Sequence, residues 1–223
     1  MKLKIKKNKI SEDGANVLIQ NARLAFVHLA KPSNSPGANS DPTYEVTILI
    51  PKKQKKEFDQ LKTILDETIK QSKAFEKAEQ RKKAASVALK IHQDGSIIKD
   101  GDKMLNRDGV VYDGLEDHYC IKVKTKADLK SDNTYAPKVK FPLKYRSNED
   151  VPTEALASEF YSGIWADVSI NFKGYVFAKK KFGVTAYLGG VMKLKNGERL
   201  GGSNPFEARD DIVEDEYDEE EGY

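Results

Sequence analysis

The sequence has little of what covalent or redox chemistry needs, starting with cysteine. Cys120 is its only cysteine, which excludes an internal disulfide and any CxxC metal or redox motif. A chain without disulfides suits a reducing compartment, and we expect the cytoplasm. No apolar run approaches about 18 residues, so no transmembrane helix is expected. The basic start, MKLKIKKNKI, is not followed by an apolar stretch, so the pattern does not predict a secretory signal.

The sequence also lacks the motifs typical of catalysis. It contains no HExxH, GxSxG, P-loop or GxGxxG pattern, and its three histidines are far apart. The lysines near Cys120 favour a thiolate, but no catalytic signature accompanies it. Four Asp-Gly steps between residues 94 and 114 predict turns, and their spacing is not that of a calcium loop. We therefore expect no enzyme activity, no metal and no cofactor.

Charge is abundant, and it is divided unequally along the chain. Residues 207–223, EARDDIVEDEYDEEEGY, contain ten Asp/Glu and one Arg, whereas residues 1–206 contain 37 Lys/Arg against 25 Asp/Glu. The tail therefore carries −9 and the body +12. Such an acidic segment cannot bury enough apolar surface to fold, so we predict that it is disordered. We expect it to compete with any polyanion for the body; the simpler alternative is a solubilising tail without a specific partner.

Alternation of apolar and polar residues predicts a mainly β domain. Residues 17–30 are typical of a strand pair or one bent strand, and further strands are predicted over residues 44–50, 118–126, 164–173 and 184–195. An apolar stripe at helical spacing predicts a helix over about residues 53–85. Short strands with one inserted helix favour a small barrel. We divide the chain into a basic N-terminal arm (1–14), a barrel domain (15–206) with its helical insertion (53–85), and the acidic tail.

One strand, and the segments after it, have the composition of a nucleic-acid surface. Lysines at every second position of residues 122–126 place ammonium groups about 6.5–7 Å apart on one face of the strand. Basic groups that follow a backbone, with rings on which bases stack, are typical of sequence-tolerant single-strand binders. For each ring the alternative is core packing. The candidate contacts are Lys122, Lys124, Lys126, Lys138, Lys140, Tyr145, Arg146, Tyr161, Trp165 and Lys173.

Several segments, taken in order, resemble a known family. They are NARLAF followed by a Pro/Gly loop and YEVTILIPK, then DGD (Asp100–Asp102), YSGIWADVSINFKGY (Tyr161–Tyr175) and KFGVTAYLGGVMKLKNGERLGG (Lys181–Gly202), ahead of the acidic tail. The chain resembles phage-encoded single-stranded-DNA-binding proteins that have an OB-fold and an acidic C-terminal tail.

The resemblance implies an OB-like five-stranded barrel with single-stranded DNA crossing one face. It implies a role in phage replication or recombination in the cytoplasm of a bacterial host cell. It also implies that the tail shields the DNA groove and, when displaced, contacts replication or recombination proteins. The tail residues concerned are Asp215, Glu216, Asp218, Glu219, Glu220, Glu221 and the terminal Tyr223.

Three other functions are compatible with the sequence. A strand-annealing recombination protein would carry the same basic and aromatic surface. A metal-dependent nuclease would use the Asp-rich region 94–117, although its carboxylates show no recognisable pairing. A scaffold protein would use the tail for assembly. The sequence is also compatible with a homodimer.

Overall fold

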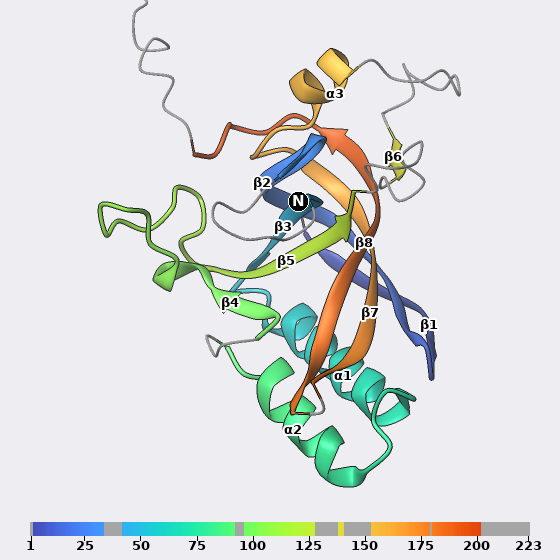
Figure 1. Cartoon of the computed structure of the whole chain (residues 1–223). Helices are drawn as coiled ribbons and strands as arrows, with labels where there is room; N and C mark the ends of the chain where they lie inside the picture. Colours follow the sequence, from blue (N-terminus) through green and yellow to red (C-terminus); the bar gives the residue numbers. More distant parts are fainter. Residues whose placement is uncertain are drawn as a thin grey trace, which may run out of the picture.

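The computed structural model describes residues 2–33, 42–91, 96–127, 138–140, 153–178 and 180–201, with the backbone alone for 138–140 and 153–155. Its strands are β1 (Lys4–Ser11), β2 (Gly14–Ser33), β3 (Thr43–Pro51), β4 (Ile98–Asp100), β5 (His118–Lys126), β6 (Lys138–Lys140), β7 (Trp165–Phe177) and β8 (Lys181–Lys195). Its helices are α1 (Lys55–Gln71), α2 (Ala78–Ala88), α3 (Thr153–Glu159) and the short 3-10 helix η1 (Gly101–Lys103) (Figure 1).

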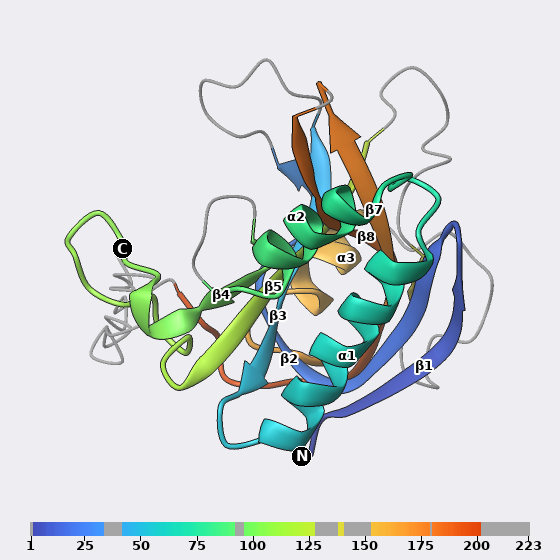
Figure 2. The same ribbon diagram turned by 90° about the horizontal axis from the view of Figure 1, so that it is seen from below.

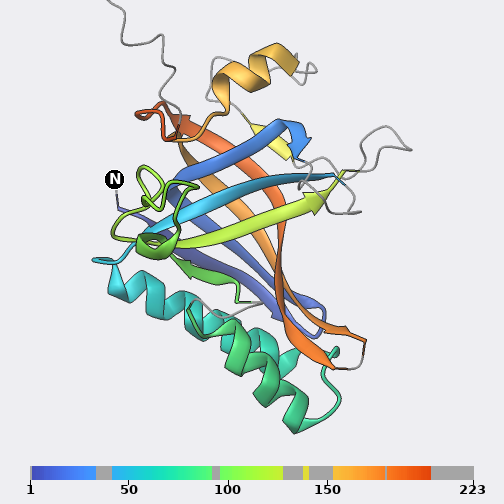
Figure 3. The same cartoon turned by 60° about the vertical axis from the view of Figure 1, so that its left-hand side comes forward.

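Five of the strands close into a barrel. Strands β5, β3, β2, β7 and β8 follow one another with antiparallel pairing. A parallel bridge between Lys124 of β5 and Tyr187 of β8 then joins the two ends of the sheet. A closed five-stranded barrel with this order of strands has the OB-like topology. The predicted mainly β barrel is thereby confirmed, and Figure 3 shows it standing above the two longer helices.

Strand β2 is one long, bent strand. Its first half pairs with β1 and its second half with β3, while β7 runs along its other edge. Two residues with positive φ, Asn21 (56°) and Phe26 (47°), lie in the bend. The buried carboxylate of Asp167 accepts hydrogen bonds from the Asn21 N–H (2.8 Å) and the Gln20 amide (3.2 Å). This carboxylate therefore stabilises a backbone conformation that non-glycine residues rarely adopt.

The inward faces of the barrel strands form the core, as their alternation predicts. On β7, Ala166, Val168, Ile170 and Phe172 are all buried, and on β3 the same holds for Val46, Ile48 and Ile50. Burying each larger side chain of this kind stabilises the fold by about 1.5–3 kcal/mol. Helix α1 covers one opening of the barrel with Phe58, Leu61 and Leu65.

The N-terminal residues that we described as a basic arm include a strand of the sheet. Strand β1 forms a hairpin with β2, and the side chains of Leu3 and Ile5 are buried. Helix α1 lies along the other side of β1, where Gln60 donates a side-chain hydrogen bond to the Ile5 carbonyl (3.0 Å). Figure 2 shows this strand and helix side by side. The segment forms a strand because apolar residues alternate with its lysines, and these apolar side chains pack into the core.

The helical insertion consists of two helices where the apolar spacing predicted one. Helix α1 ends at Gln71, because Ser72 takes an extended conformation (φ −64°, ψ 126°). The Ser72 hydroxyl accepts a hydrogen bond from the Ala74 N–H (3.2 Å) and stabilises the turn. The turn carries Phe75, which is fully buried, against Gly174 of β7. Helix α2 then packs on β8.

Residues 101–117 form a loop that an ion-paired lysine holds against the barrel. The Lys52 ammonium lies 2.5 Å from a carboxylate oxygen of Asp100 and 2.6 Å from one of Asp102. The second Asp102 oxygen accepts a hydrogen bond from the Asp117 N–H (2.7 Å). The loop thus covers a small apolar cluster on the outside of the barrel, made of Ala25, Leu49, Leu115, Cys120 and Leu200. The DGD segment (Asp100–Asp102) therefore has a structural role, because its two carboxylates bind Lys52 and attach the loop to the barrel.

Replacing Asp102 by Asn should lower the thermal stability of the protein at neutral pH and reduce the loss of stability on acidification. Lys52, and after it the Asp117 N–H, hold the pKa of Asp102 below its ordinary value of 3.8. A lowered carboxyl pKa stabilises the folded state above the unfolded pKa, and this contribution disappears as the pH falls through the folded pKa. Thermal unfolding followed by circular dichroism between pH 2.5 and 7 should show the two curves converging below about pH 3.8.

Asp108→Asn, at the exposed end of the same loop, is the matched control and should leave Tm unchanged at neutral pH. A Tm difference between wild type and Asp102→Asn that persists undiminished at pH 2.5 would contradict the ion-pair explanation.

Candidate nucleic-acid interface

The three lysines of β5 lie in a column on the outside of the barrel. Lys122, Lys124 and Lys126 are exposed, whereas Ile121 and Val123, at the alternate positions of the strand, are fully buried. The rise of a strand separates successive lysines by about 6.5–7 Å. The predicted arrangement of these side chains is therefore confirmed, and the column presents a line of positive charge.

The neighbouring strand β3 neutralises one member of this column. Glu45 is 8% exposed, and its carboxylate lies 2.8 Å from the Lys122 ammonium. The Thr43 hydroxyl donates to the same carboxylate (3.3 Å). Lys124 is the direct strand partner of Glu45, yet it forms no ion pair with any residue that the structure describes. Lys124 is therefore the member of the column best placed to receive an external anion.

Tyr187 of β8 lies beside Lys124 and was missed by the sequence reasoning. The two residues are partners in the parallel bridge that closes the barrel, and the tyrosine is 44% exposed. The ammonium of Lys173 on β7 lies 5.8 Å from the centre of the Tyr187 ring. The alternation of residues 184–188 could have identified this tyrosine. Val184, Ala186 and Leu188 point into the core, so Tyr187, at an odd position between them, must point outward.

Trp165 lies at a different place on the barrel, near the start of β7. It is half-buried between the strand partners Arg23 of β2 and Lys195 of β8. The Lys195 ammonium is 5.5 Å from the centre of the indole. Arg23 donates a hydrogen bond to the Glu198 carbonyl (3.2 Å) and so holds the chain that follows β8. Trp165 thus has cations on both sides, and part of its ring is accessible.

Tyr161 has contacts within the protein on its hydroxyl and on its ring. The hydroxyl donates to the Gly197 carbonyl (2.9 Å) and accepts from the Gly197 N–H (3.3 Å). The guanidinium carbon of Arg199 lies 4.2 Å from the centre of the ring. In the free protein Tyr161 therefore fastens the segment after β8, and its role in DNA binding stays a prediction.

The structure describes the other predicted site residues only in part. The backbone of β6 places Lys138 beside Gly190 and Lys140 beside Met192 of β8, on the edge that β5 occupies further along. Tyr145 and Arg146 lie outside the described residues, as do the tail residues Asp215–Tyr223. The sites expected there remain predictions.

The single thiol and the Asp-rich loop have structural surroundings. Burial raises the pKa of Cys120 to about 12, so the thiol is protonated at neutral pH despite the neighbouring lysines. The carboxylates of Asp100 and Asp102 are paired with Lys52. Among the residues that the structure describes, no three His, Cys, Asp or Glu side chains form a group suited to a metal ion.

The barrel and its outer face define an OB-fold protein whose exposed cations lie next to aromatic rings, a class that includes many nucleic-acid binders. The chain belongs to the family described as Enterobacter phage Enc34, ssDNA-binding protein, whose model matches residues 15–222. No curated protein sequence matches the chain.

In the described part of the chain, no helix has both the length and the apolar character to cross a bilayer.

Solved structures share the fold at low sequence identity. The single-stranded DNA-binding protein from bacteriophage Enc34 is 23% identical, with a TM-score of 0.55, and the match covers 90% of this chain and 95% of that one. The same bacteriophage Enc34 protein in complex with ssDNA gives 23% identity and a TM-score of 0.56, over 89% and 99% of the two chains. A C-terminal truncation of it gives 22% and 0.55, over 89% and 99%.

Proposed function

We propose that this protein binds single-stranded DNA, without strong sequence preference, through the outer face of β5 and β8. The observation that carries the proposal is the lysine column of β5 lying directly beside the exposed ring of Tyr187. Membership of a family described as ssDNA-binding supports it. The protein acts by binding, and the proposal includes no catalytic step.

The proposed face overlaps, at β5, the surface that OB-folds commonly use to bind oligonucleotides. They commonly use the outer face of the second and third barrel strands, with the loops that follow the first and fourth. Here the second and third strands are β3 and β5, and the hairpin turn between β7 and β8 carries Lys180 and Lys181, both exposed. Phosphates would lie along Lys122, Lys124 and Lys126, and a base would stack on Tyr187.

Single strands are favoured over duplexes by the aromatic part of the surface. Base stacking on an aromatic side chain contributes about 1–3 kcal/mol per base, and the bases of a duplex are already stacked on one another. Tyr187 and the accessible part of Trp165 are two described rings that lie beside cations on the outside of the barrel. The remaining predicted contacts, among them Tyr145 and Arg146, belong to this proposal as expectations.

The proposed biological role is the protection and handling of single strands during phage DNA replication or recombination in the host cytoplasm. The acidic tail, with its −9 charge, competes with DNA for the lysine column. DNA binding then releases the tail, whose terminal Tyr223 and acidic residues contact replication or recombination proteins. The uneven distribution of charge along the chain supports this part of the proposal.

Fluorescence and anisotropy measured in one titration should reveal the preference for single strands. We expect a labelled thirty-mer of dT to bind more tightly than a duplex of equal length, with a slope of log affinity against log salt of about −3 to −4 if four to six lysines engage. Trp165 is the single tryptophan, so quenching reports on the strand near the start of β7. Equal, weak binding to both nucleic acids would contradict the proposal.

Substitutions of the two neighbouring residues should separate charge from stacking. Lys124→Gln should reduce the magnitude of the salt slope by about 0.7, because one phosphate contact is lost. Tyr187→Ala should weaken binding by about 1–3 kcal/mol and leave the slope unchanged. Lys103→Gln, which removes an equal charge from the exposed η1, is the control for Lys124→Gln and should have no effect on the slope. A Lys103→Gln effect as large as that of Lys124→Gln would mean that only net charge matters.

Deletion of residues 207–223 should tighten binding to single-stranded DNA, most strongly at low salt. The reason is that the tethered polyanion no longer occupies the lysine column, and salt screens this competition. The measurement is the dT thirty-mer titration of full-length and truncated protein at several salt concentrations. Identical affinities at low ionic strength would show that the tail does not compete.

A further inference from the structure

A row of outward-facing side chains leads from the lysine column around the barrel to the N-terminal strand. Strand pairing sets the row residue by residue: Lys124 of β5 is opposite Tyr187 of β8, which is opposite Asn171 of β7. Asn171 is opposite Asn16 of β2, and Asn16 is opposite Lys9 of β1. We call these five residues the lateral row. It spans four strand spacings, or about 19 Å along the surface.

The lateral row offers a nucleic acid polar groups between its two cationic ends. Lys9, Asn16, Tyr187 and Lys124 are exposed, and Asn171 is half-buried. The Asn171 side-chain amide donates a hydrogen bond to the side-chain Oδ1 of Asn16 (2.5 Å), which orients the Asn16 amide group at the surface. Lys173 adds a charge next to Tyr187. Phosphate oxygens accept hydrogen bonds from amide N–H groups as well as from lysines.

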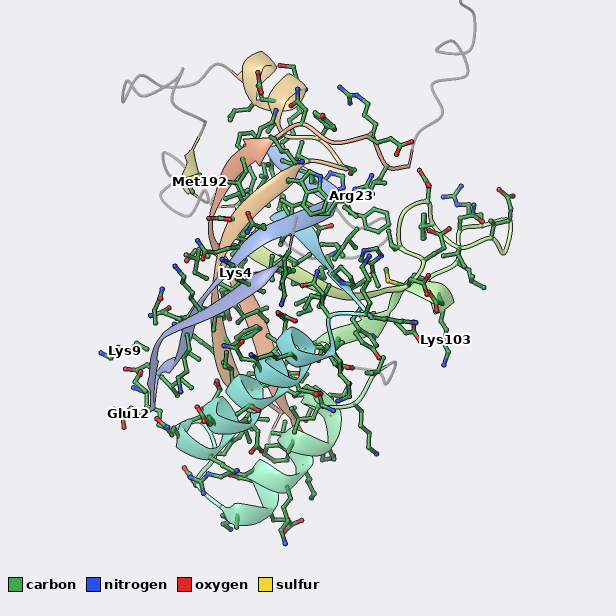
Figure 4. The ribbon with its side chains drawn as sticks, turned by 180° about the vertical axis from the view of Figure 1, so that it is seen from behind. Lys4, Lys9, Glu12, Arg23, Lys103 and Met192 are labelled. Carbon is green, nitrogen blue, oxygen red and sulfur yellow. The ribbon has the colours of Figure 1, made fainter. Side chains whose placement is uncertain are left out.

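The lysines of β1, together with Lys2 just before it, fall into two sets. Lys2 and Lys7 form ion pairs with Glu57 and Glu67 of α1, at 3.3 and 2.9 Å. The other set, Lys4, Lys6 and Lys9, lies opposite Gln20, Leu18 and Asn16 of β2 and is exposed. In the described part of the chain, no carboxylate forms an ion pair with this second set. Figure 4 shows Lys9 pointing outward from β1, close to the hairpin turn at Glu12.

The row beside the lateral row has small residues on two of its four strands. It contains Lys6, Leu18, Ser169 and Gly190, of which Ser169 on β7 and Gly190 on β8 are small. Gly189 is an extra residue at a register shift and is exposed. A strand that leaves Tyr187 therefore passes small residues on β8 and β7 before it reaches Leu18 and the β1 lysines.

We infer that single-stranded DNA continues from Tyr187 along the lateral row and ends on Lys4, Lys6 and Lys9, so that β1 lengthens the DNA track by about three nucleotides. The inference rests on the proposed function. Strand β1 precedes residues 15–222, the part of this chain that matches the family model. The two sets of β1 lysines then have separate roles, one in packing on α1 and one in binding DNA.

The test compares two triple variants that lose the same charge. Lys4→Gln/Lys6→Gln/Lys9→Gln removes the exposed β1 set, and Lys55→Gln/Lys56→Gln/Lys70→Gln removes exposed charges from α1. Each is titrated with dT oligonucleotides of increasing length, and the occluded site size is measured on poly(dT). The β1 variant should bind the shortest oligonucleotides as wild type does. On long ones its salt slope should be smaller by about 2, and its site size smaller by about three nucleotides.

The α1 variant should behave as wild type at every length, and equal losses in both variants would overturn the inference. So would an unchanged site size of the β1 variant, or a loss that is the same for short and long oligonucleotides. The comparison is repeated after deletion of residues 207–223; a difference that vanishes there would mean that β1 holds the tail and not DNA. Absence of single-strand binding by the wild type would instead contradict the proposed function.

Discussion

The parallel contact between β5 and β8 is the constraint from which the surface of this protein follows. It closes a barrel whose other four strand pairs are all antiparallel, and it joins residues that are more than sixty positions apart. Closure removes the free edges of the sheet and gives every barrel strand one inward and one outward face. Because Lys124 and Tyr187 are the residues that meet, a lysine column and an aromatic ring become neighbours on the outward face.

The same closure explains why outward residues form rows around the barrel. Strand β2 is long and bent, so its first half supports β1 and its second half supports β3. The bend depends on the Asp167 carboxylate that holds the Asn21 N–H. Through this strand the N-terminal hairpin becomes continuous with the surface of β7 and β8. The hairpin strand β1, which precedes the residues that match the family model, is thereby attached to the face that carries the proposed DNA site.

The lysines of this protein differ in whether they form an ion pair with a carboxylate. Three of the six lysines of α1 and α2 are matched by carboxylates one turn away, in the pairs Lys55–Asp59, Lys70–Asp66 and Lys83–Glu79. Such pairs contribute little to stability but cancel the field of the helical surface. Lys124 and the exposed set on β1 have no such partner among the described residues. Positive charge that carries no carboxylate partner in the described part of the chain is therefore present on β5 and β1, where a polyanion can reach it.

Local patterns in the sequence determined the strands and their faces. The alternation that buries Phe172 and exposes Lys122, Lys124 and Lys126 depends only on the two-residue period of a strand, so it was predictable without a structure. The end of α1 at Ser72 was not, because a distant glycine of β7 makes the room that Phe75 fills. Nor was the place of Leu3 and Ile5, whose burial requires β2 and α1 to be assembled first. Which rings and cations meet was decided by the tertiary structure alone, since the register and closure of a sheet depend on pairings between strands far apart in the chain.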